Sequence, residues 1–331
     1  MRTARSISAL SAVIAVLALA ASGCGDDSSS TSSSADVTAV ATTTQVADFV
    51  REVGGDRVAV EQILQPNSDP HGYEPRPSDA KALAEADVVF QSGGELDEWL
   101  DGLIENTGGD APRVELIQAV ETIPGGHEHE EDEHADDEEV HDHGDSADPH
   151  WWQDPRNALL AVDAVRDALI AADPGGRADY EANARAYKER LRRLDRNVAA
   201  CIDSIPAAQL KLVTTHDALA YYSHRYDIDV VGALIPSLST AAQPSAGDTQ
   251  RLVDQIEREN VEAIFPEGSI NPKLERAVAR ETGAKVGRAL WADALGPEDS
   301  DGATYVESVQ SNTAALVDGL TGGAEQCRPE A

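Results

Sequence analysis

The feature that most limits the fold of this chain is one long amphipathic segment near its middle, from Arg177 to Ile202. Apolar and small side chains recur in it at spacings of three and four, with charged residues between them, which predicts a helix with one buried face. At 1.5 Å per residue such a helix is roughly 40 Å long. It can connect two domains rigidly, and the alternative is a coiled-coil surface for a partner chain. The recurring positions are Tyr180, Ala184, Tyr187, Leu191, Leu194, Val198 and Cys201.

On both sides of this segment, short apolar runs typical of strands alternate with runs typical of helices. This alternation predicts parallel sheets covered by helices on both faces. We therefore expect an α/β fold of two doubly wound lobes joined by the long helix. The predicted strands are Val37–Thr42, Val58–Leu64, Val88–Phe90, Val114–Ile117, Leu212–Thr215, Asp229–Ala233, Val261–Phe265 and Lys285–Leu290. The predicted helices are Thr44–Val53, one capped by Ser78 and running to Ala86, Leu96–Ile104, Asn157–Ala172, one that follows His216 and runs to Tyr226, Ala246–Glu259, Pro272–Thr282 and Thr304–Leu320.

The N-terminus has the pattern of an export signal. A basic start is followed by an apolar run, Ile7 to Ala21, that is too short to span a bilayer. Small residues then precede Cys24, which predicts a bacterial lipoprotein signal with Cys24 as the lipidated first residue. The usual Leu three positions before the cysteine is replaced by Ala21, and a plain secretory signal is the alternative. The predicted divisions are a signal peptide with its cysteine (1–24), a flexible tether (25–36), a first lobe (37–155) that includes a His-rich loop (125–148), connecting helices (156–206) and a second lobe (207–322).

Composition limits the partners. The net charge of −34 argues against nucleic acid or an anionic membrane as the main partner. In an exported chain, the two remaining cysteines, Cys201 and Cys327, form a candidate disulfide. The alternative is two separate buried thiols.

The segment from Gly125 to Pro155 begins with histidines among many Asp and Glu residues. A run so poor in apolar side chains cannot bury a core, so we expect it to be solvated. Imidazoles bind Zn, Ni and Cu, which indicates an accessory metal-gathering loop, with an acidic solubilising linker as the alternative. The histidines of this loop are His127, His129, His134, His141 and His143.

Four other side chains lie at the predicted ends of strands or in stiff turns. His71 and His150 each follow an Asp-Pro pair, His216 follows a strand of the second lobe, and Asp293 follows the last strand. Ligands of open α/β sheets bind at the carboxyl ends of the strands, so we expect two side chains from each lobe to face a common cleft. Three imidazoles and one carboxylate suit a tetrahedral Zn²⁺ site. Taken singly, each histidine could instead be solvated and Asp293 could serve a turn.

Six separated blocks carry a resemblance to a known family, and they extend over about Val37 to Leu320. They resemble the metal-binding lipoproteins of ABC importers, the cluster A-I or ZnuA/TroA-like family. The blocks are DPHGYEPRPSD, QSGGELDEWLDGL, DPHWWQDP after the acidic run, TTHDALAYYSHRY, VEAIFPEGSINPKLERAVARETGAKV and LWADALG. The WWQ of the third block departs from the usual VWL, and we expect no contact with a ligand there.

The resemblance implies a function as well as a fold of two lobes on one long helix. His71, His150, His216 and Asp293 fall on the family's metal ligands. Members that resemble zinc binders have His at the third position and a His-rich loop, whereas those that resemble manganese binders tend to have Glu and no loop. Zn²⁺ is therefore expected, with Mn²⁺ as the alternative.

The implied role is that of a monomeric receptor that is lipid-anchored outside the cytoplasmic membrane and delivers metal to an ABC permease and its ATPase. The chain has no G-x-x-x-x-G-K-[ST] motif, so the energy must come from these partners. A zinc hydrolase is disfavoured because there is no H-E-x-x-H motif and four ligands leave no open position. A passive metal buffer or an adhesin remains an alternative.

Other residues have weaker predictions. Glu267 is an alternative ligand or a group behind a ligand. Glu74 could orient His71 or pair with Arg76, and His224 is expected on a helix surface or in packing. Metal binding needs neutral imidazoles, so affinity should fall as the pH drops through about 6.5.

Overall fold

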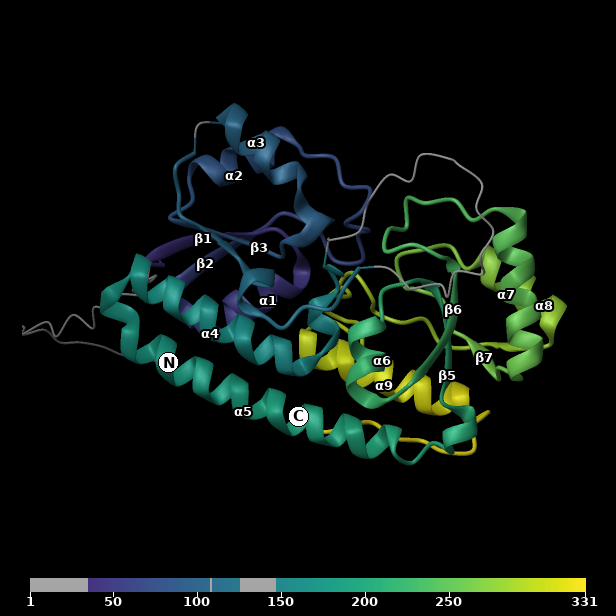
Figure 1. Ribbon diagram of the computed structural model, residues 1–331. Helices are drawn as coiled ribbons and strands as arrows, with labels where there is room; N and C mark the ends of the chain where they lie inside the picture. The colour runs from purple at the N-terminus through teal and green to yellow at the C-terminus, as the bar shows by residue number, and fades with distance from the viewer. Residues whose placement is uncertain (1–34, 108, 126–146) are drawn as a thin grey trace, which may run out of the picture. The chain divides into compact units, whose positions relative to one another are not determined.

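The computed structural model describes residues 35–107, 109–125 and 147–331, which belong to the compact unit Ser34–Ala331. In this part of the chain the expected α/β fold is confirmed, because parallel strands alternate with helices throughout (Figure 1). Within the same ranges, no helix combines the length and the apolar character needed to cross a bilayer.

The first half contains a four-stranded parallel sheet in the order β2-β1-β3-β4. Alternate residues of its strands point to opposite faces. Ala39 and Phe90 pack toward α1 and the long helices α4 (Pro155–Ala172) and α5 (Arg177–Ile202). Val40 and Val89 pack toward α2 and α3. Helices therefore cover both faces, as Figure 1 shows. The elements are β1 (Val37–Ala41), α1 (Thr44–Gly54), β2 (Val58–Gln62), α2 (Pro77–Ala84), β3 (Val88–Gln91), α3 (Trp99–Thr107) and β4 (Arg113–Glu115).

The second half contains two parallel pairs of strands, β5 with β6 and β7 with β8. A parallel bridge between Thr214 and Phe265 places β5 beside β7, so the four strands have their carboxyl ends on one side. The elements are β5 (Lys211–His216), α6 (Ala220–Tyr226), β6 (Asp229–Ile235), α7 (Ala246–Glu259), β7 (Ala263–Ile264), α8 (Lys273–Thr282), β8 (Lys285–Val286) and α9 (Tyr305–Leu320).

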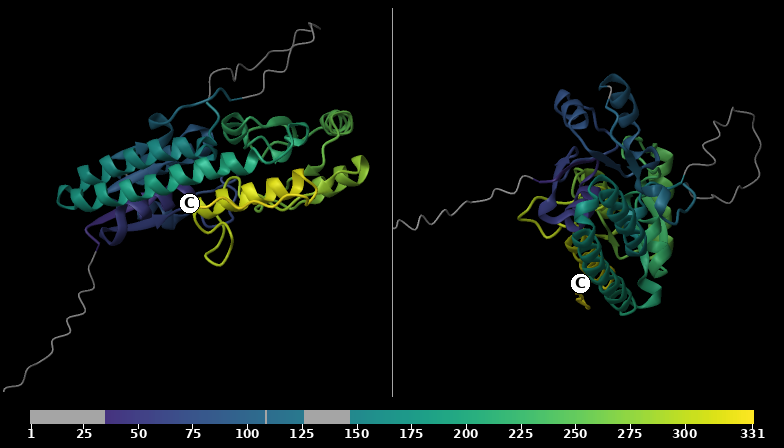
Figure 2. Two further views of the ribbon diagram at one scale, coloured as in Figure 1. Left: turned by 90° about the horizontal axis from the view of Figure 1, so that it is seen from below. Right: turned by 90° about the vertical axis from the view of Figure 1, so that its left-hand side faces the viewer.

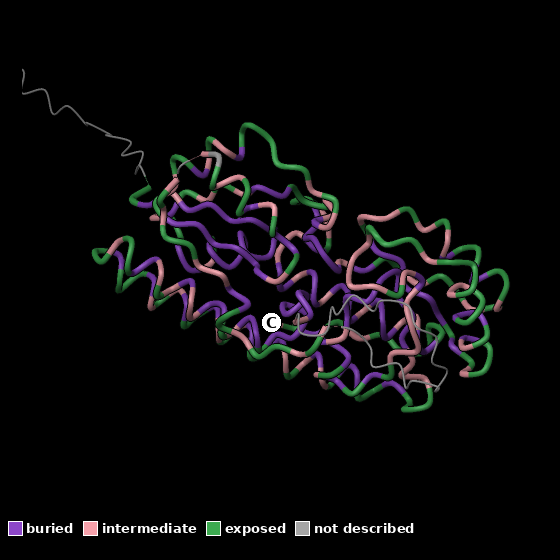
Figure 3. The backbone as a smooth tube through the Cα atoms, turned by 45° about the horizontal axis from the view of Figure 1, so that its top comes forward, coloured by how far each residue is buried: buried purple, intermediate pink, exposed green. Residues whose placement is uncertain are grey.

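Helix α5 (Arg177–Ile202) has the predicted bounds, and the seven recurring positions are all buried. They pack against α1, α9 and α4 (Pro155–Ala172) in one core that includes residues of both halves. Figures 1 and 2 show α5 beside α4 and continuing to the second half, and Figure 3 shows buried and exposed residues alternating along it. The coiled-coil alternative is therefore wrong, because this face is already covered by the chain itself.

Several predicted boundaries are wrong for local reasons. Ser78 does not cap α2, because Pro77 occupies the first helical position, where its missing N–H costs nothing, and Arg76 is the cap residue. Asp79 accepts a hydrogen bond from the Arg76 N–H (2.6 Å). Strand β8 covers only Lys285–Val286 of the predicted run: Gly287 still donates to the Ile264 carbonyl (2.9 Å), and pairing resumes only in a parallel bridge between Leu290 and Glu267. Gly287 packs so closely on the Phe265 ring that a Cβ would lie 2.6 Å from it.

Other helices and strands begin or end at residues that differ from the prediction because a 3₁₀ turn replaces part of the predicted element. A turn at Gly94–Asp97 precedes α3, so this helix begins at Trp99 rather than at Leu96. A second turn, Leu116–Ala119, takes the place of the last residues predicted for β4. Helix α6 begins at Ala220, so His216 is separated from it by a short loop.

Cys201, at the end of α5, and Cys327, in the C-terminal tail, are joined by a disulfide with a Cα–Cα distance of 5.6 Å. The tail is held further by Asn197, which donates to the Glu330 carbonyl (2.8 Å), and by Gln310, which donates to the Pro329 carbonyl (2.7 Å). These contacts fasten the tail to α5 and α9.

Replacing both cysteines by Ser is expected to lower the free energy of unfolding by about 2–5 kcal/mol, because the bridge closes a loop of 126 residues and restricts the unfolded chain. Urea unfolding of the metal-free protein, followed by circular dichroism, measures this. Reductant should destabilise the wild type and leave the double variant unchanged. Equal midpoints for the oxidised wild type and the variant would contradict the prediction.

Candidate metal site

His71 is held in the loop between β2 and α2. Asp69 accepts a hydrogen bond from the His71 N–H through Oδ1 (3.0 Å), and Pro70 between them restricts the backbone. At the start of the loop, the Asn67 N–H donates to the Leu295 carbonyl (2.8 Å). The loop is therefore fixed both within itself and to the second half.

His150 repeats the same local device. Asp148 accepts hydrogen bonds from the His150 N–H and from its Nδ1, each at 2.8 Å, and Pro149 lies between the two residues. The His150 side chain is fully buried, and the Trp152 ring meets it edge-on with 5.5 Å between ring centroids. A buried carboxylate on Nδ1 fixes the tautomer that leaves Nε2 as the metal-binding atom.

His216 is the last residue of β5, and it is oriented by Glu267 just beyond β7. Glu267 Oε1 accepts from both the N–H (3.0 Å) and Nδ1 (2.6 Å) of His216. Of the two roles expected for Glu267, this geometry supports the one behind a ligand, since its bonded oxygen faces Nδ1. The remaining donor atom of His216 is again Nε2.

Asp293 lies in the loop between β8 and α9, and this loop is bonded to the first half of the molecule. The Ala292 carbonyl accepts from Trp152 Nε1 (3.0 Å) and Gln153 Nε2 (2.8 Å). Two residues after Asp293, the Leu295 N–H donates to Thr44 Oγ1 (2.8 Å). The position of Asp293 is therefore determined mainly by residues distant in sequence.

The four side chains converge. Their donor atoms all lie within 4.8 Å of one another, three of the residues are buried and His71 is partly buried. Asp293 Oδ2 lies 3.3 Å from Nε2 of both His71 and His216, and Asp293 Oδ1 lies 3.4 Å from His150 Nε2. The geometry thus brings together the set expected from the sequence.

The cluster needs a cation. His150 and His216 use Nδ1 to donate to carboxylates, so their neutral forms direct two Nε2 lone pairs at each other across 3.3 Å. His71 Nε2 and both oxygens of Asp293 are buried and have no hydrogen-bond partner in the part of the chain that the structure describes. Buried groups of this kind are costly unless they are paired or bind a metal. A divalent ion would satisfy all of them, and Asp293 could supply one oxygen or two.

The charges of the cluster affect its protonation. Burial opposes a charge on His216, but the Asp293 and Glu267 carboxylates outweigh it and raise the pKa of His216 to about 9. Burial also acts against ionised Asp293, yet the surrounding imidazoles, His216 first, lower its pKa well below the ordinary value. Burial raises the pKa of Glu267. In the metal-free protein a proton on His216 is therefore the cation that competes with metal.

A cavity of about 570 Å³ leads toward His71. It is lined by the aromatic pair Tyr73 and Trp99 on the first half and by residues 237–239 on the second. Gly125 and Ala147, near the two ends of the predicted His-rich loop, also line it. Of the four donor residues His71 lines the cavity, so the cavity reaches the cluster at this residue.

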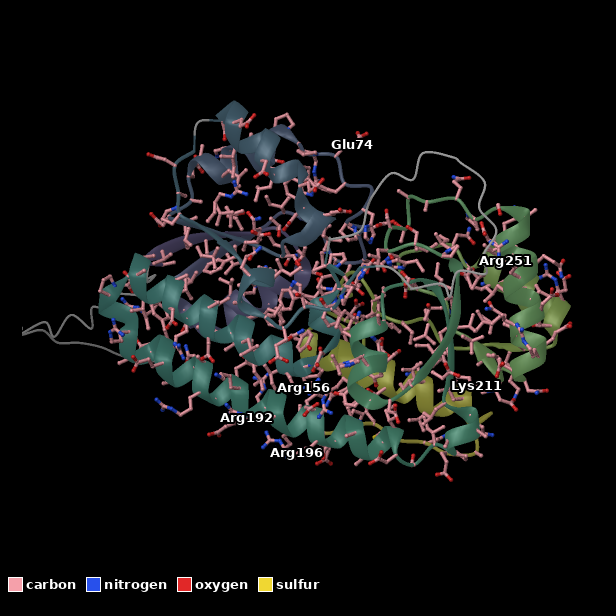
Figure 4. The ribbon with its side chains drawn as sticks, in the orientation of Figure 1. Glu74, Arg156, Arg192, Arg196, Lys211 and Arg251 are labelled. Atoms are coloured by element: carbon pink, nitrogen blue, oxygen red, sulfur yellow. A yellow bond between two sulfur atoms is a disulfide. The ribbon has the colours of Figure 1, made fainter. Side chains whose placement is uncertain are left out.

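Other predicted residues lie elsewhere. Glu74 is exposed and points away from the cluster (Figure 4), and no hydrogen bond or ion pair joins it to His71 or Arg76 among the described residues. The expected orienting role is wrong, since the Asp69 carboxylate holds the His71 backbone instead. His224 is exposed on α6. Cys24 and the loop histidines 127, 129, 134, 141 and 143 lie outside the described residues.

Four supporting residues have no role predicted from the sequence: Asp69, Asp148, Trp152 and Gln153. For the first two a signal existed, because Asp-Pro-His occurs twice and an Asp two residues before a His can accept its N–H. The contacts of Trp152 and Gln153 join residues about 140 positions apart. The expectation of no contact with a ligand at WWQ is wrong for Trp152, whose ring meets His150 edge-on, and Trp152 and Gln153 also hold the residue before Asp293.

Comparison with known proteins identifies similar metal-binding proteins. A family model described as "ZnuA: Zinc-uptake complex component A periplasmic" matches residues 39–319. The manganese-binding lipoproteins MntA of Halalkalibacterium halodurans and Bacillus subtilis are each 31% identical to this chain, covering 93% and 94% of it and 97% and 98% of the relatives. The solved periplasmic zinc-binding protein TroA from Treponema pallidum is 27% identical with a TM-score of 0.76, over 86% of this chain and 99% of TroA.

Metal affinity is expected to rise about tenfold per pH unit from pH 7 to about 9, because metal must displace the proton of His216. This pH range lies above about pH 6.5, where an ordinary histidine pKa predicts that the affinity falls. The same proton stabilises the metal-free fold below about pH 6.5, and this stabilisation is lost as the pH rises through about 9. Competitive titrations with a chelator at several pH values measure the affinity. Affinity independent of pH between 7 and 9 would contradict the assignment.

Glu267→Gln is expected to weaken metal binding about 10–100-fold, because the group behind a histidine ligand loses its charge. Isothermal titration gives the change in affinity. Glu262→Gln, at an exposed position five residues earlier, is the matched control and should bind like the wild type. An unaltered affinity in Glu267→Gln would show that the carboxylate has no part in the site.

Proposed function

This chain belongs to the family of zinc-uptake complex component A, periplasmic, and from its similarity to relatives named as manganese-binding we propose that it captures manganese outside the cytoplasmic membrane for an ABC permease. At the family level it is the solute-binding component of an ABC importer of divalent metals and an extracytoplasmic protein. Members of this family are not enzymes, so the hydrolase alternative no longer applies.

One observation carries the proposal that His71, His150, His216 and Asp293 bind the cargo. Their lone pairs and carboxylate oxygens face one another in a buried space, and several of these atoms have no hydrogen-bond partner among the described residues. Carboxylates hold the imidazoles of His150 and His216 from behind, and Asp69 holds the backbone of His71, so the donors are positioned to bind a metal. Metal capture is therefore the chemistry that satisfies the cluster.

Manganese is favoured by the curated relatives, several of which are named as manganese-binding. Both oxygens of Asp293 face imidazoles, so the site can offer five donors, and Mn²⁺ prefers higher coordination numbers and oxygen ligands. The zinc preference inferred from the resemblance is thus the second candidate for this chain.

Zinc keeps support from the donor set, because a third imidazole at position 216 suits Zn²⁺. The relative TroA is named a zinc-binding protein. Affinity alone does not identify the cargo, since Zn²⁺ binds most nitrogen and oxygen sites more tightly than Mn²⁺. The metal that the importer accumulates in cells is the deciding quantity.

The rest of the proposal concerns location and partners. We place the protein as a monomer on a lipid anchor at Cys24, tethered by residues 25–36 and delivering metal to a permease driven by a cytoplasmic ATPase. The relatives named as lipoproteins support the anchor. The loop with His127, His129, His134, His141 and His143 would gather metal for the site.

His216→Ala is expected to weaken metal binding more than about a hundredfold, or about 2.7 kcal/mol, because one of few donors is lost. His224→Ala removes an exposed histidine from α6 and is the matched control. In cells lacking the native gene, uptake of radioactive manganese should return with wild type and His224→Ala but not with His216→Ala. If the wild type restored uptake of zinc but not of manganese, zinc would be the cargo. Full metal uptake with His216→Ala would contradict the assignment of the site.

A further inference from the structure

The four donor residues are not shared evenly between the two halves. Asp293 follows β8 of the second half, but the residues on both sides of it are hydrogen-bonded to Trp152, Gln153 and Thr44 of the first half. The Asp293 loop is therefore hydrogen-bonded to the first half on both sides of the carboxylate, although Trp291 also exchanges hydrogen bonds with Asn312 of α9 (2.8 Å each). His216, on β5, is the donor whose backbone hydrogen bonds stay within the second half in the described part of the chain.

Asp69 connects these two parts of the site. One oxygen, Oδ1, accepts from the His71 N–H (3.0 Å), and the other, Oδ2, accepts from Thr240 Oγ1 (2.6 Å). Thr240 lies in the loop between β6 and α7 of the second half. The carboxylate that orders the backbone of His71 therefore also reaches across to the opposite half.

The loop of Thr240 borders the approach to the cluster. Residues 237–239 line the cavity together with Pro70 and His71. The Ser237 carbonyl also accepts a hydrogen bond from the Asp217 N–H (3.1 Å), directly after His216. A movement of this loop away from Asp69 would open the cavity and pull on the chain beside His216.

We propose that the Asp69–Thr240 hydrogen bond is a latch that keeps the two halves closed over the bound metal and sets the rate at which the metal leaves. This inference rests on the proposed function of the cluster. Asp69 is a positioning residue, since it touches His71 and Thr240 and is not one of the four donors. A hydrogen bond to a charged group is stronger than one between neutral groups, so its loss should speed metal dissociation about tenfold.

The test uses the full chain loaded with Co²⁺, whose visible absorption reports the coordination of the metal. Mixing with excess EDTA gives the dissociation rate. Thr240→Val should release Co²⁺ about tenfold faster with an unchanged spectrum, and Thr240→Ser, which keeps the hydroxyl, should behave like the wild type. Thr249→Val is the control, because its hydroxyl donates to the carbonyl of Ser245, the residue that caps α7, and so makes a local bond within the second half.

A second variant separates the latch from a general structural effect. In an Asp69→Ala background the partner of the hydroxyl is gone, so adding Thr240→Val should change the rate no further. The latch would be overturned if Thr240→Val sped up metal dissociation equally with and without Asp69. It would also be overturned if Thr240→Val alone left the dissociation rate unaltered. A folded wild type that takes up no Co²⁺ would contradict the proposed function itself, and the latch with it.

Discussion

The arrangement of the site depends on an unfavourable interaction: buried lone pairs directed at one another. His150 and His216 present Nε2 atoms 3.3 Å apart, and Asp293 adds a carboxylate without a hydrogen-bond partner. Such a cluster is stable only if its surroundings hold the groups in place and a cation neutralises them. Asp148 and Glu267 supply the first condition by fixing the two imidazoles from behind. The divalent cargo, or a proton in its absence, supplies the second.

The fold provides the rigidity that this interaction needs. The strands of both halves are parallel, so their carboxyl ends place His216 and the loops that carry the other donors on facing edges. Helix α5 packs into a core that includes residues of both halves, which limits their relative motion. A site assembled between two halves can then keep its geometry, while small movements remain available for uptake and release.

Capture and release make opposite demands on such a site. Tight binding needs all donors fixed, whereas delivery to a permease needs at least one of them to move. The hydrogen bonds around Ala292 and Leu295 attach the Asp293 loop to the first half. His216 and the Thr240 loop lie on the other half, which Asp69 contacts through Thr240, and Tyr221 of α6 adds a hydrogen bond to the Asp148 carbonyl. The expectation of two donors from each half holds along the chain, and Asp293 is the donor whose loop is also bonded to the opposite half.

The sequence by itself determined the elements with strong local signals. The spacing of three and four defined α5 and its buried face, and Asp-Pro-His defined two stiff histidines, because these patterns act through near neighbours. Only the tertiary structure decided that Glu267 stands behind His216, that Glu74 points to solvent, and that Gln153 holds the residue before Asp293. These roles depend on contacts between residues far apart in the chain, and no local pattern specifies which distant strands and loops meet.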